Sequence, residues 1–290
     1  MFAQENSSPD NPSLTAYKVA LMRAVHQVLD DPIVFEDPLA LSIAGIRRDS
    51  DIHSLQRKYG SRIQKYLRAM VVARSRFVED ELSGAIKNGI RQYVILGAGL
   101  DTYPYRNPDS SAGLKIFEVD HPATQEWKRR QLDAAELPVP EILTFVPVDF
   151  EIQSLALQLA EAGFRADEPS FFSWLGVVVY LSRGSMMETM KYIASGTAAG
   201  TTIVFDYVVP PSSQGILRRL IFRRLTRKVV GYGEPWQTFY DPDSLVDDLK
   251  ALGFSRVHDV GSEELNAMYF SSRADKLKAG SSGHLIKAQL

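Results

Sequence analysis

Two glycines and one acidic residue, placed after successive apolar runs, have the types and spacing of a ligand site. Gly97 and Gly99 follow the run at residues 93–96, and Asp120 comes 23 positions after Gly97, where the next run ends. In an open parallel sheet, a glycine turn lets the backbone approach a ligand, and an acid after the next strand can accept hydrogen bonds from ribose hydroxyls. The structural alternatives are a simple tight turn and an acid that caps the following helix.

A missing glycine narrows the class of ligand. A dinucleotide site would have a third glycine at position 102, where a pyrophosphate meets the helix start, but this sequence has Thr102. The substitution disfavours a nicotinamide-dependent dehydrogenase. It favours a nucleoside without phosphates, for which S-adenosylmethionine is the common case. Glu118 lies two positions before Asp120 on the same strand face and is the alternative ribose ligand.

Composition excludes several other kinds of chemistry. The 290 residues include no cysteine, which excludes disulfides, thiolate zinc sites and cysteine nucleophiles. The five histidines have no pair at i, i+4, so we expect no metal site. The formal net charge of −2 gives no reason to expect a nucleic-acid partner. No apolar run reaches 18 residues and no signal-peptide pattern opens the chain, so we expect a cytoplasmic protein without an integral membrane part.

The elements that must position these residues alternate between strand and helix. Five continuous apolar runs, typical of strands buried on both faces, are separated by helix-length segments, and two further strands follow late in the chain. This alternation predicts an α/β fold with a parallel sheet and helices on both of its faces. The predicted strands are residues 93–96, 115–119, 143–148, 171–175, 202–205, 256–260 and 284–290, and the helices 124–135, 153–162, 184–194 and 243–252.

Two regions depart from this alternation. Helical periodicity from Leu14 to Ser83, interrupted at two Asp-Pro pairs, predicts an N-terminal helical cap over residues 1–88, ahead of a core over 89–290. After the fifth strand, a lid insertion is predicted at about 209–242. Its basic segment, 215–230, could steer an anionic substrate, form a solvated face, or contact acidic lipid or a partner. The basic residues are Arg218, Arg219, Arg223, Arg224, Arg227 and Lys228.

Five blocks of this sequence resemble the leucine carboxyl methyltransferase-like family, which includes bacterial carboxyl O-methyltransferases of polyketide and peptide pathways. They are MVVARSRFVED, VILGAGLDTYPYR, FEVDHP, PVDF and FFSWLGVVVYL, which begin at residues 70, 94, 117, 147 and 171. The specific feature is the glycine motif combined with Glu-Val-Asp-x-Pro. The resemblance spans from about Leu14 to the C-terminus. It implies an S-adenosylmethionine-dependent O-methyltransferase with a Rossmann-like class I fold: a seven-strand, mostly parallel sheet, a helical N-terminal cap and a helical lid insertion after strand 5.

The resemblance also implies a set of cofactor contacts. Arg74 would pair with the methionine carboxylate, and Asp120 would hold the ribose. The remaining contacts would be Gly97, Ala98 and Gly99 along the cofactor and Asp149 with Phe150 around the adenine. A planar guanidinium suits a free carboxylate, which agrees with the role implied for Arg74.

Alternatives and departures accompany these assignments. Arg74 could instead pair with Glu79 or Asp80 on its own helix, and Phe150 could belong partly to the core. The family usually has arginine where Tyr103 stands, which leaves Arg106 as the basic residue of that turn. Many members have glutamate where Leu175 stands, so a further cofactor contact is missing here.

The need for a catalytic base depends on the methyl acceptor. Holding donor and acceptor in line can remove roughly 7–11 kcal/mol of barrier without a base. A carboxylic acid with a pKa near 4 is ionised at pH 7, whereas ionising a phenol with a pKa near 10 costs roughly 4 kcal/mol. We therefore predict base-free methylation of a carboxylate on a small metabolite or peptide. The alternatives are phenol or hydroxyl methylation and a non-catalytic nucleoside-binding protein.

Tyr180 and His121 are the predicted catalytic residues. Tyr180, Arg23 and the arginines of the insertion are candidates for holding the acceptor carboxylate. His121 is the one histidine predicted beside the site, where it could act as a base or else start a helix and line the cofactor. An aromatic wall is predicted from Trp236, Phe239 and Tyr240, with a place in the core as the alternative.

Overall fold

One seven-strand sheet organises the chain in a computed structural model that describes residues 13–46, 49–107, 113–149, 153–210 and 236–290. Phe150 and the basic segment 215–230 lie outside the described residues. The strands are β1 Gln92–Leu96, β2 Lys115–Asp120, β3 Leu143–Pro147, β4 Phe171–Trp174, β5 Thr202–Val208, β6 Arg256–Val260 and β7 Gly283–Gln289. They lie in the order β3-β2-β1-β4-β5-β7-β6.

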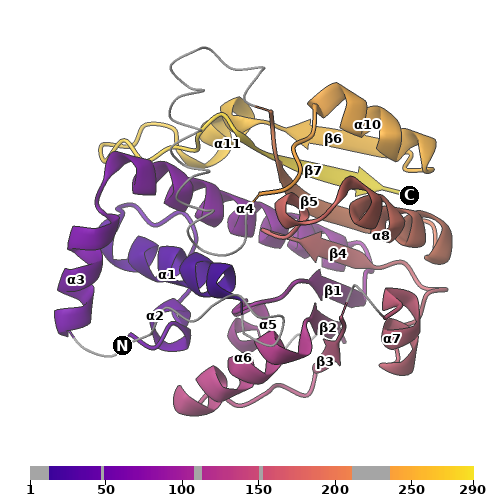
Figure 1. The fold of residues 1–290 in the computed structure, drawn as a ribbon, viewed down its shortest axis with the longest axis horizontal. Coiled ribbons are helices and arrows are strands. Elements are labelled where there is room, and N and C mark those ends of the chain that lie inside the picture. The colour runs from indigo at the N-terminus through magenta and orange to yellow at the C-terminus, as the bar shows by residue number, and fades with distance from the viewer. Residues whose placement is uncertain (1–12, 47–48, 108–112, 150–152, 211–235) are drawn as a thin grey trace.

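The predicted α/β class and mostly parallel sheet are confirmed. β7 pairs antiparallel with β5 and β6, and every other pairing is parallel. Helices lie on both faces of the sheet (Figure 1). They are α1 Leu14–Leu29, α2 Ala40–Ile43, α3 Asp49–Tyr59, α4 Arg62–Lys87, α5 Tyr103–Arg106, α6 Pro122–Ala134, α7 Leu155–Glu161, α8 Arg183–Gly196, α10 Pro242–Ala251 and α11 Ser262–Tyr269, with a 3-10 turn η1 at Val178–Tyr180. None of the helices in the described ranges has the length and apolar character needed to cross a membrane.

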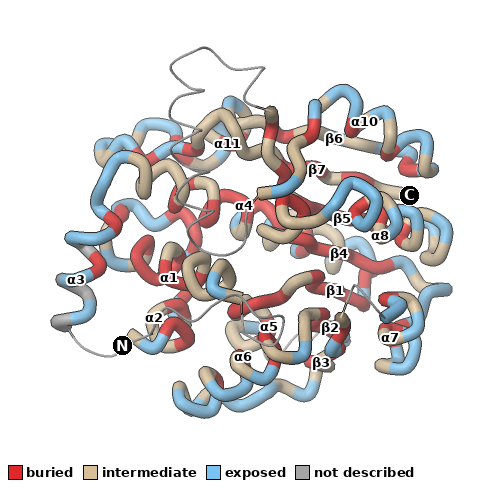
Figure 2. Tube along the Cα trace, viewed as in Figure 1, coloured by how far each residue is buried: buried red, intermediate tan, exposed pale blue. Residues whose placement is uncertain are grey.

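Helices cover both faces of the central strands, and this explains their continuous apolar runs. Tyr93 and Ile95 of β1 pack in a cluster with α4 and α11, while Val94 and Leu96 pack in a second cluster with α7, α8 and α10. All five residues of β1 are buried, as the colouring of the central strands in Figure 2 shows. Side chains alternate between faces along a strand, so two-sided burial requires apolar residues at consecutive positions.

The N-terminal helices form a third cluster around α1, α2 and α3, with Leu100 of the glycine turn and Leu132 of α6 packed into it. α4 differs from them because its apolar side packs directly on the sheet. The helical character predicted for residues 14–83 is confirmed, and the breaks at the Asp-Pro pairs separate α1 from α2. The predicted domain boundary near residue 88 stays a prediction.

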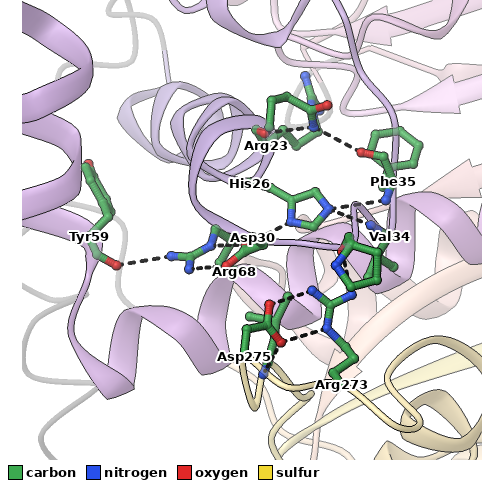
Figure 3. Close-up of polar contacts among 12 residues, drawn as sticks. Arg23, His26, Asp30, Val34, Phe35, Tyr59, Arg68, Arg273 and Asp275 are labelled. Carbon is green, nitrogen blue, oxygen red and sulfur yellow. Dashed lines mark hydrogen bonds and ion pairs between the residues drawn. The ribbon is translucent and has the colours of Figure 1, made fainter.

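A buried polar network joins α1 to α4 (Figure 3). His26 contacts Asp30 at 2.8 Å, and its other ring nitrogen accepts hydrogen bonds from the backbone N–H groups of Val34 and Phe35. Arg68 donates to both oxygens of Asp30 at 2.6 and 2.7 Å. Burial opposes ionisation of Asp30, but the hydrogen bonds from Arg68 and His26 outweigh it and lower its pKa to about 2. A charge that is buried and fully bonded in this way fixes the two helices relative to each other.

We expect Asp30→Asn to lower the free energy of unfolding by about 3–5 kcal/mol, because it leaves the buried Arg68 guanidinium without its counter-charge. In the wild type, the lowered pKa of Asp30 contributes about 2 kcal/mol above pH 4, and this is lost as the pH falls towards 2. Urea unfolding at pH 7 measures the first effect. Glu126→Gln, which breaks an exposed i, i+4 pair with Arg130, is the control and should change stability by under about 0.5 kcal/mol. Equal losses in both variants would contradict the assignment.

Candidate functional site

A cavity of about 260 Å³ lies where β1, β2 and β4 end, covered by the first turns of α1. Its lining brings together residues that are far apart in the sequence. Of the predicted site residues, Arg74, Gly97, Ala98, Gly99, Asp120, His121 and Tyr180 line it. Asp149 follows β3 near the same edge of the sheet but is not among the lining residues, and Phe150 lies outside the described residues. We refer to this space as the cofactor cavity.

The glycine turn passes too close to its neighbours for any side chain. Gly97 has φ of +65°, and a Cβ there would lie 2.3 Å from a methyl carbon of Val177. Gly99 has φ of +49°, and a Cβ there would lie 3.0 Å from the Cβ of Ala16 on α1. Both the left-handed backbone and the close contacts require glycine. The turn therefore presents bare backbone to the cavity, as a site for a nucleoside needs.

Asp120 is held at the edge of the cavity by its own neighbours. One carboxylate oxygen accepts from the Gly99 N–H at 2.5 Å, and the other accepts from the His121 N–H at 2.7 Å. Burial nevertheless outweighs these bonds and raises the pKa of Asp120. Each carboxylate oxygen can accept more than one hydrogen bond, so the Asp120 carboxylate can also accept hydrogen bonds from ribose hydroxyls.

Glu118, the alternative ribose ligand, lies on the same face of β2 as predicted but does not line the cavity. It is fully buried against Lys128 of α6, with a nitrogen–oxygen distance of 2.6 Å. Burial outweighs the Lys128 ammonium and raises the pKa of Glu118 to about 7. Of the two acids on this strand face, Asp120 is therefore the one that faces the ligand space.

Arg74 reaches from α4 across the site to β5. Its guanidinium pairs with Asp206 at 2.6 Å, and the other oxygen of Asp206 accepts from the Gly176 N–H at 2.5 Å. Neither Glu79 nor Asp80 forms an ion pair with Arg74, because Glu79 pairs with Arg106 and Asp80 with Arg76. A guanidinium carries five donors, so Arg74 keeps donors for a ligand carboxylate while Asp206 holds it.

His121 is the N-cap of α6. Its Nδ1 accepts from the Ala123 N–H at 3.3 Å, which uses that nitrogen in the structure of the helix start. The ring lines the cofactor cavity next to Asp120. Between the two roles considered for His121, this position agrees with the helix start and cofactor lining.

A second cavity of about 230 Å³ opens against the first. The two share Thr15, Val19, Arg74, Gly176 and Tyr180 as a common wall. The rest of the second cavity is mainly apolar, with Met22, Leu67, Met70, Val71, Val179, Val208 and Trp236 among its lining residues. We refer to it as the acceptor cavity. Its parts come from α1, α4, η1, β5 and β7, so the sequence pattern alone did not indicate it.

Of the three residues predicted as an aromatic wall, Trp236 lines the acceptor cavity. The segment that carries it is held beside η1, where the Gln237 N–H donates to the carbonyl of Val179 at 2.8 Å. Phe239 contacts the Trp236 ring edge-on, whereas Tyr240 is buried in the core, which was the alternative.

Arg23 has a role that the sequence did not reveal. It lines the cofactor cavity, but its guanidinium donates to the carbonyl of Leu100 and pairs with the buried Asp37 at 3.1 Å. Thr102 donates to the same Asp37 at 2.8 Å, and Arg106 also approaches it. These contacts fix the glycine turn against α1, so Arg23 is a positioning residue.

The Arg106 side chain points to Glu79 and Asp37 and does not line the cofactor cavity.

Comparisons with known proteins identify the family and relatives of this chain. Residues 16–194 match the family model described as leucine carboxyl methyltransferase. The chain is 30% identical over 298 residues to "Putative S-adenosyl-L-methionine-dependent methyltransferase YktD" of Bacillus subtilis, covering 95% of this chain and 97% of the relative. A Mycolicibacterium paratuberculosis protein with the same description is 30% identical, over 67% of this chain and 65% of its own length. A duf574 family protein from Streptomyces avermitilis shares the fold, with a TM-score of 0.56, 12% identity and coverage of 97% and 99%.

We expect Asp120→Ala to weaken binding of S-adenosylhomocysteine by tenfold or more, because it removes both the predicted ribose acceptor and the group that holds the Gly99 N–H. Isothermal titration calorimetry measures the affinity. Asp133→Ala, on the exposed side of α6, is the matched control and should bind as the wild type does. An unchanged affinity in a folded Asp120→Ala protein would remove Asp120 from the site.

Proposed function

The chain belongs to the leucine carboxyl methyltransferase family of S-adenosylmethionine-dependent methyltransferases, and on that premise we propose that it methylates a carboxylate on a small metabolite or peptide. Family membership and the strand order together confirm the predicted class I methyltransferase fold. The observation that carries the carboxylate assignment is the lining of the acceptor cavity. Among its described residues, Asp206 is the one carboxylate, and no histidine lines it.

Asp206 is poorly suited to act as a base. One of its oxygens pairs with the Arg74 guanidinium, and the other accepts from the Gly176 N–H. Taking a proton would weaken both contacts at once. An acceptor that is already ionised, such as a carboxylate, needs no such proton transfer, whereas a phenol needs a base within hydrogen-bonding distance.

The cofactor cavity fits S-adenosylmethionine. The bare backbone of the glycine turn, the fixed Asp120 carboxylate and the Arg74 guanidinium match a nucleoside, its ribose and an amino-acid carboxylate. When bound, S-adenosylmethionine would supply a methyl group on a positively charged sulfur. The carbon–sulfur bond would break as the acceptor carboxylate oxygen formed its bond to that carbon. A methyl ester and S-adenosylhomocysteine result, and no proton moves.

Tyr180 lies where donor and acceptor would meet. It is the last residue of η1, whose turn is closed by a hydrogen bond from the Tyr180 N–H to the carbonyl of Val177, and it lines both cavities. We assign its hydroxyl to orienting the acceptor carboxylate. Lys18 also lines the acceptor cavity.

For a carboxylic acid substrate, we expect kcat to stay constant within twofold between pH 5.5 and 8, because the acceptor is ionised throughout this range. A radiometric methyl-transfer assay with saturating acid measures this profile. A phenol panel in the same assay is the comparison. Methylation of phenols alone, with a rate that falls below pH 7, would replace our proposal with phenol methylation. Cofactor binding without any methyl transfer to a carboxylate, phenol or amine would favour a binding protein.

We expect Tyr180→Phe to lower kcat/KM for the acid by about 10- to 100-fold, since a hydrogen bond to a charged group contributes about 1.5–3 kcal/mol. The affinity for S-adenosylhomocysteine should change less than threefold. Tyr192→Phe, on α8 outside both cavities, is the control and should match the wild type. A normal kcat/KM in Tyr180→Phe would contradict the assignment of its hydroxyl.

A further inference from the structure

A third and wider concavity, of about 680 Å³, borders the acceptor cavity at Tyr66. Tyr66 of α4 lines both spaces. Gly280, on the segment between α11 and β7, lines the acceptor cavity, and a Cβ added to it would lie 3.9 Å from the Cβ of Tyr66. Tyr66 therefore marks the boundary between the two spaces, at the start of α4.

The concavity is strongly basic. Its lining includes five cationic side chains: Arg62, Lys65, Arg273, Lys276 and Lys278. The one acid in the lining is Asp275, and Arg273 donates hydrogen bonds to both of its carboxylate oxygens at 2.6 and 2.9 Å (Figure 3). Four cations therefore converge on this space without a matching acid among the described lining residues.

Elsewhere on the described surface, four exposed arginines each have an acidic partner. Arg76 pairs with Asp80, Arg130 with Glu126, Arg165 with Asp167, and Arg183 with Asp248. The whole chain carries a net charge of −2, so the excess of positive charge at the concavity is local. A local excess in a hollow attracts anions more than isolated surface lysines do.

The backbone that presents these cations is fixed. Lys276 has φ of +56°, a left-handed conformation that a residue with a side chain rarely adopts. It is flanked by Asp275, which Arg273 holds, and by Leu277, which is 1% exposed. Arg273 also donates to the carbonyl of Pro32, which ties this loop to the N-terminal helices. Such conformations persist where the surroundings impose them and are concentrated at functional sites.

We propose that the methyl acceptor carries two anionic groups separated by an apolar chain. This inference rests on the proposed function, and it names the class of acid. One carboxylate lies at the wall shared with the cofactor cavity, beside Tyr180, and the chain follows the apolar lining of Met70 and Val208. The second anion passes Tyr66 and binds in the basic concavity. Most of the acceptor cavity lining is apolar and offers little to a second charge, whereas the basic concavity presents four cations without a matching acid, so we place the far group there.

The test compares octanedioate with octanoate, two acids of equal chain length, in the full-length enzyme. Wild-type enzyme should methylate octanedioate with at least tenfold higher kcat/KM than octanoate. Lys65→Glu/Lys276→Glu should lower the octanedioate-to-octanoate ratio by tenfold or more. Lys191→Glu/Lys250→Glu, at exposed positions on α8 and α10, makes the same charge change away from the concavity and should keep the wild-type ratio. Melting temperatures establish that each variant is folded.

Calorimetry in the presence of S-adenosylhomocysteine measures the same preference without turnover. We expect octanedioate to bind more tightly than octanoate, and the advantage to shrink as salt rises from 50 to 500 mM, because ions screen the far contact. Equal use of the two acids by the wild type, or a ratio that the Lys65→Glu/Lys276→Glu variant leaves unchanged, would overturn the inference while leaving carboxylate methylation intact. Selective binding of octanedioate with no methylation of either acid would instead overturn the proposed function and retain the anion subsite.

Discussion

The ion pair between Arg74 and Asp206 is the contact on which the arrangement of the site depends. It joins α4 to β5 across 132 positions of sequence, and Gly176 completes it by donating its N–H to the same carboxylate. Both charges are mostly buried, with side chains 9% and 12% exposed, so losing either partner would leave the other without compensation in a poorly hydrated place. Because Arg74 and Gly176 line both cavities, the same contact fixes part of the wall that the two cavities share.

The rest of the site depends on how closely the backbone can approach this wall. A Cβ at Gly176 would lie 2.7 Å from the Arg74 guanidinium, and one at Gly97 would meet Val177. On the opposite side, Arg23 fixes α1 against the glycine turn through the carbonyl of Leu100. The cofactor cavity is thus enclosed by main chain below and by a helix above. Its shape follows from backbone positions and buried charges more than from loop side chains, which suits a ligand that must be held in one orientation.

The sequence predicted the elements well because their signals are local. Continuous apolar runs identified the first five strands, and the alternation of strand and helix late in the chain identified the last two. The alternation of side chains between faces placed Glu118 and Asp120 on one side of β2. This alternation could not show which of the two acids faces the cofactor cavity. That choice depends on Lys128, which lies ten positions away on α6 and pairs with Glu118.

The sequence pattern also could not predict which distant residues pair with one another, because it carries only local signals. The two acids weighed as alternative partners of Arg74, Glu79 and Asp80, lie on its own helix, whereas the structure pairs it with Asp206. Nothing local distinguishes these carboxylates. The acceptor cavity is a stronger example, because it is built from five separate elements whose residues resemble ordinary core residues in isolation. From the sequence, Trp236 could be assigned either to an aromatic wall of the site or to the core.

An apolar acceptor cavity beside a charged cofactor cavity has a consequence for the proposed reaction. A carboxylate and a sulfonium cancel each other's charge as the methyl group transfers, so the charges are more dispersed in the transition state than in the separated reactants. Surroundings with little water and few dipoles therefore favour the transition state over the reactants. Val19, on the shared wall, and Met70 and Val208 beyond it provide such surroundings, while Arg74 remains neutralised by Asp206 and adds little net field. The same apolar lining gives no stabilisation to a charge that does not react. The larger group of cations that a second anion on the proposed acceptor would need lies beyond Tyr66.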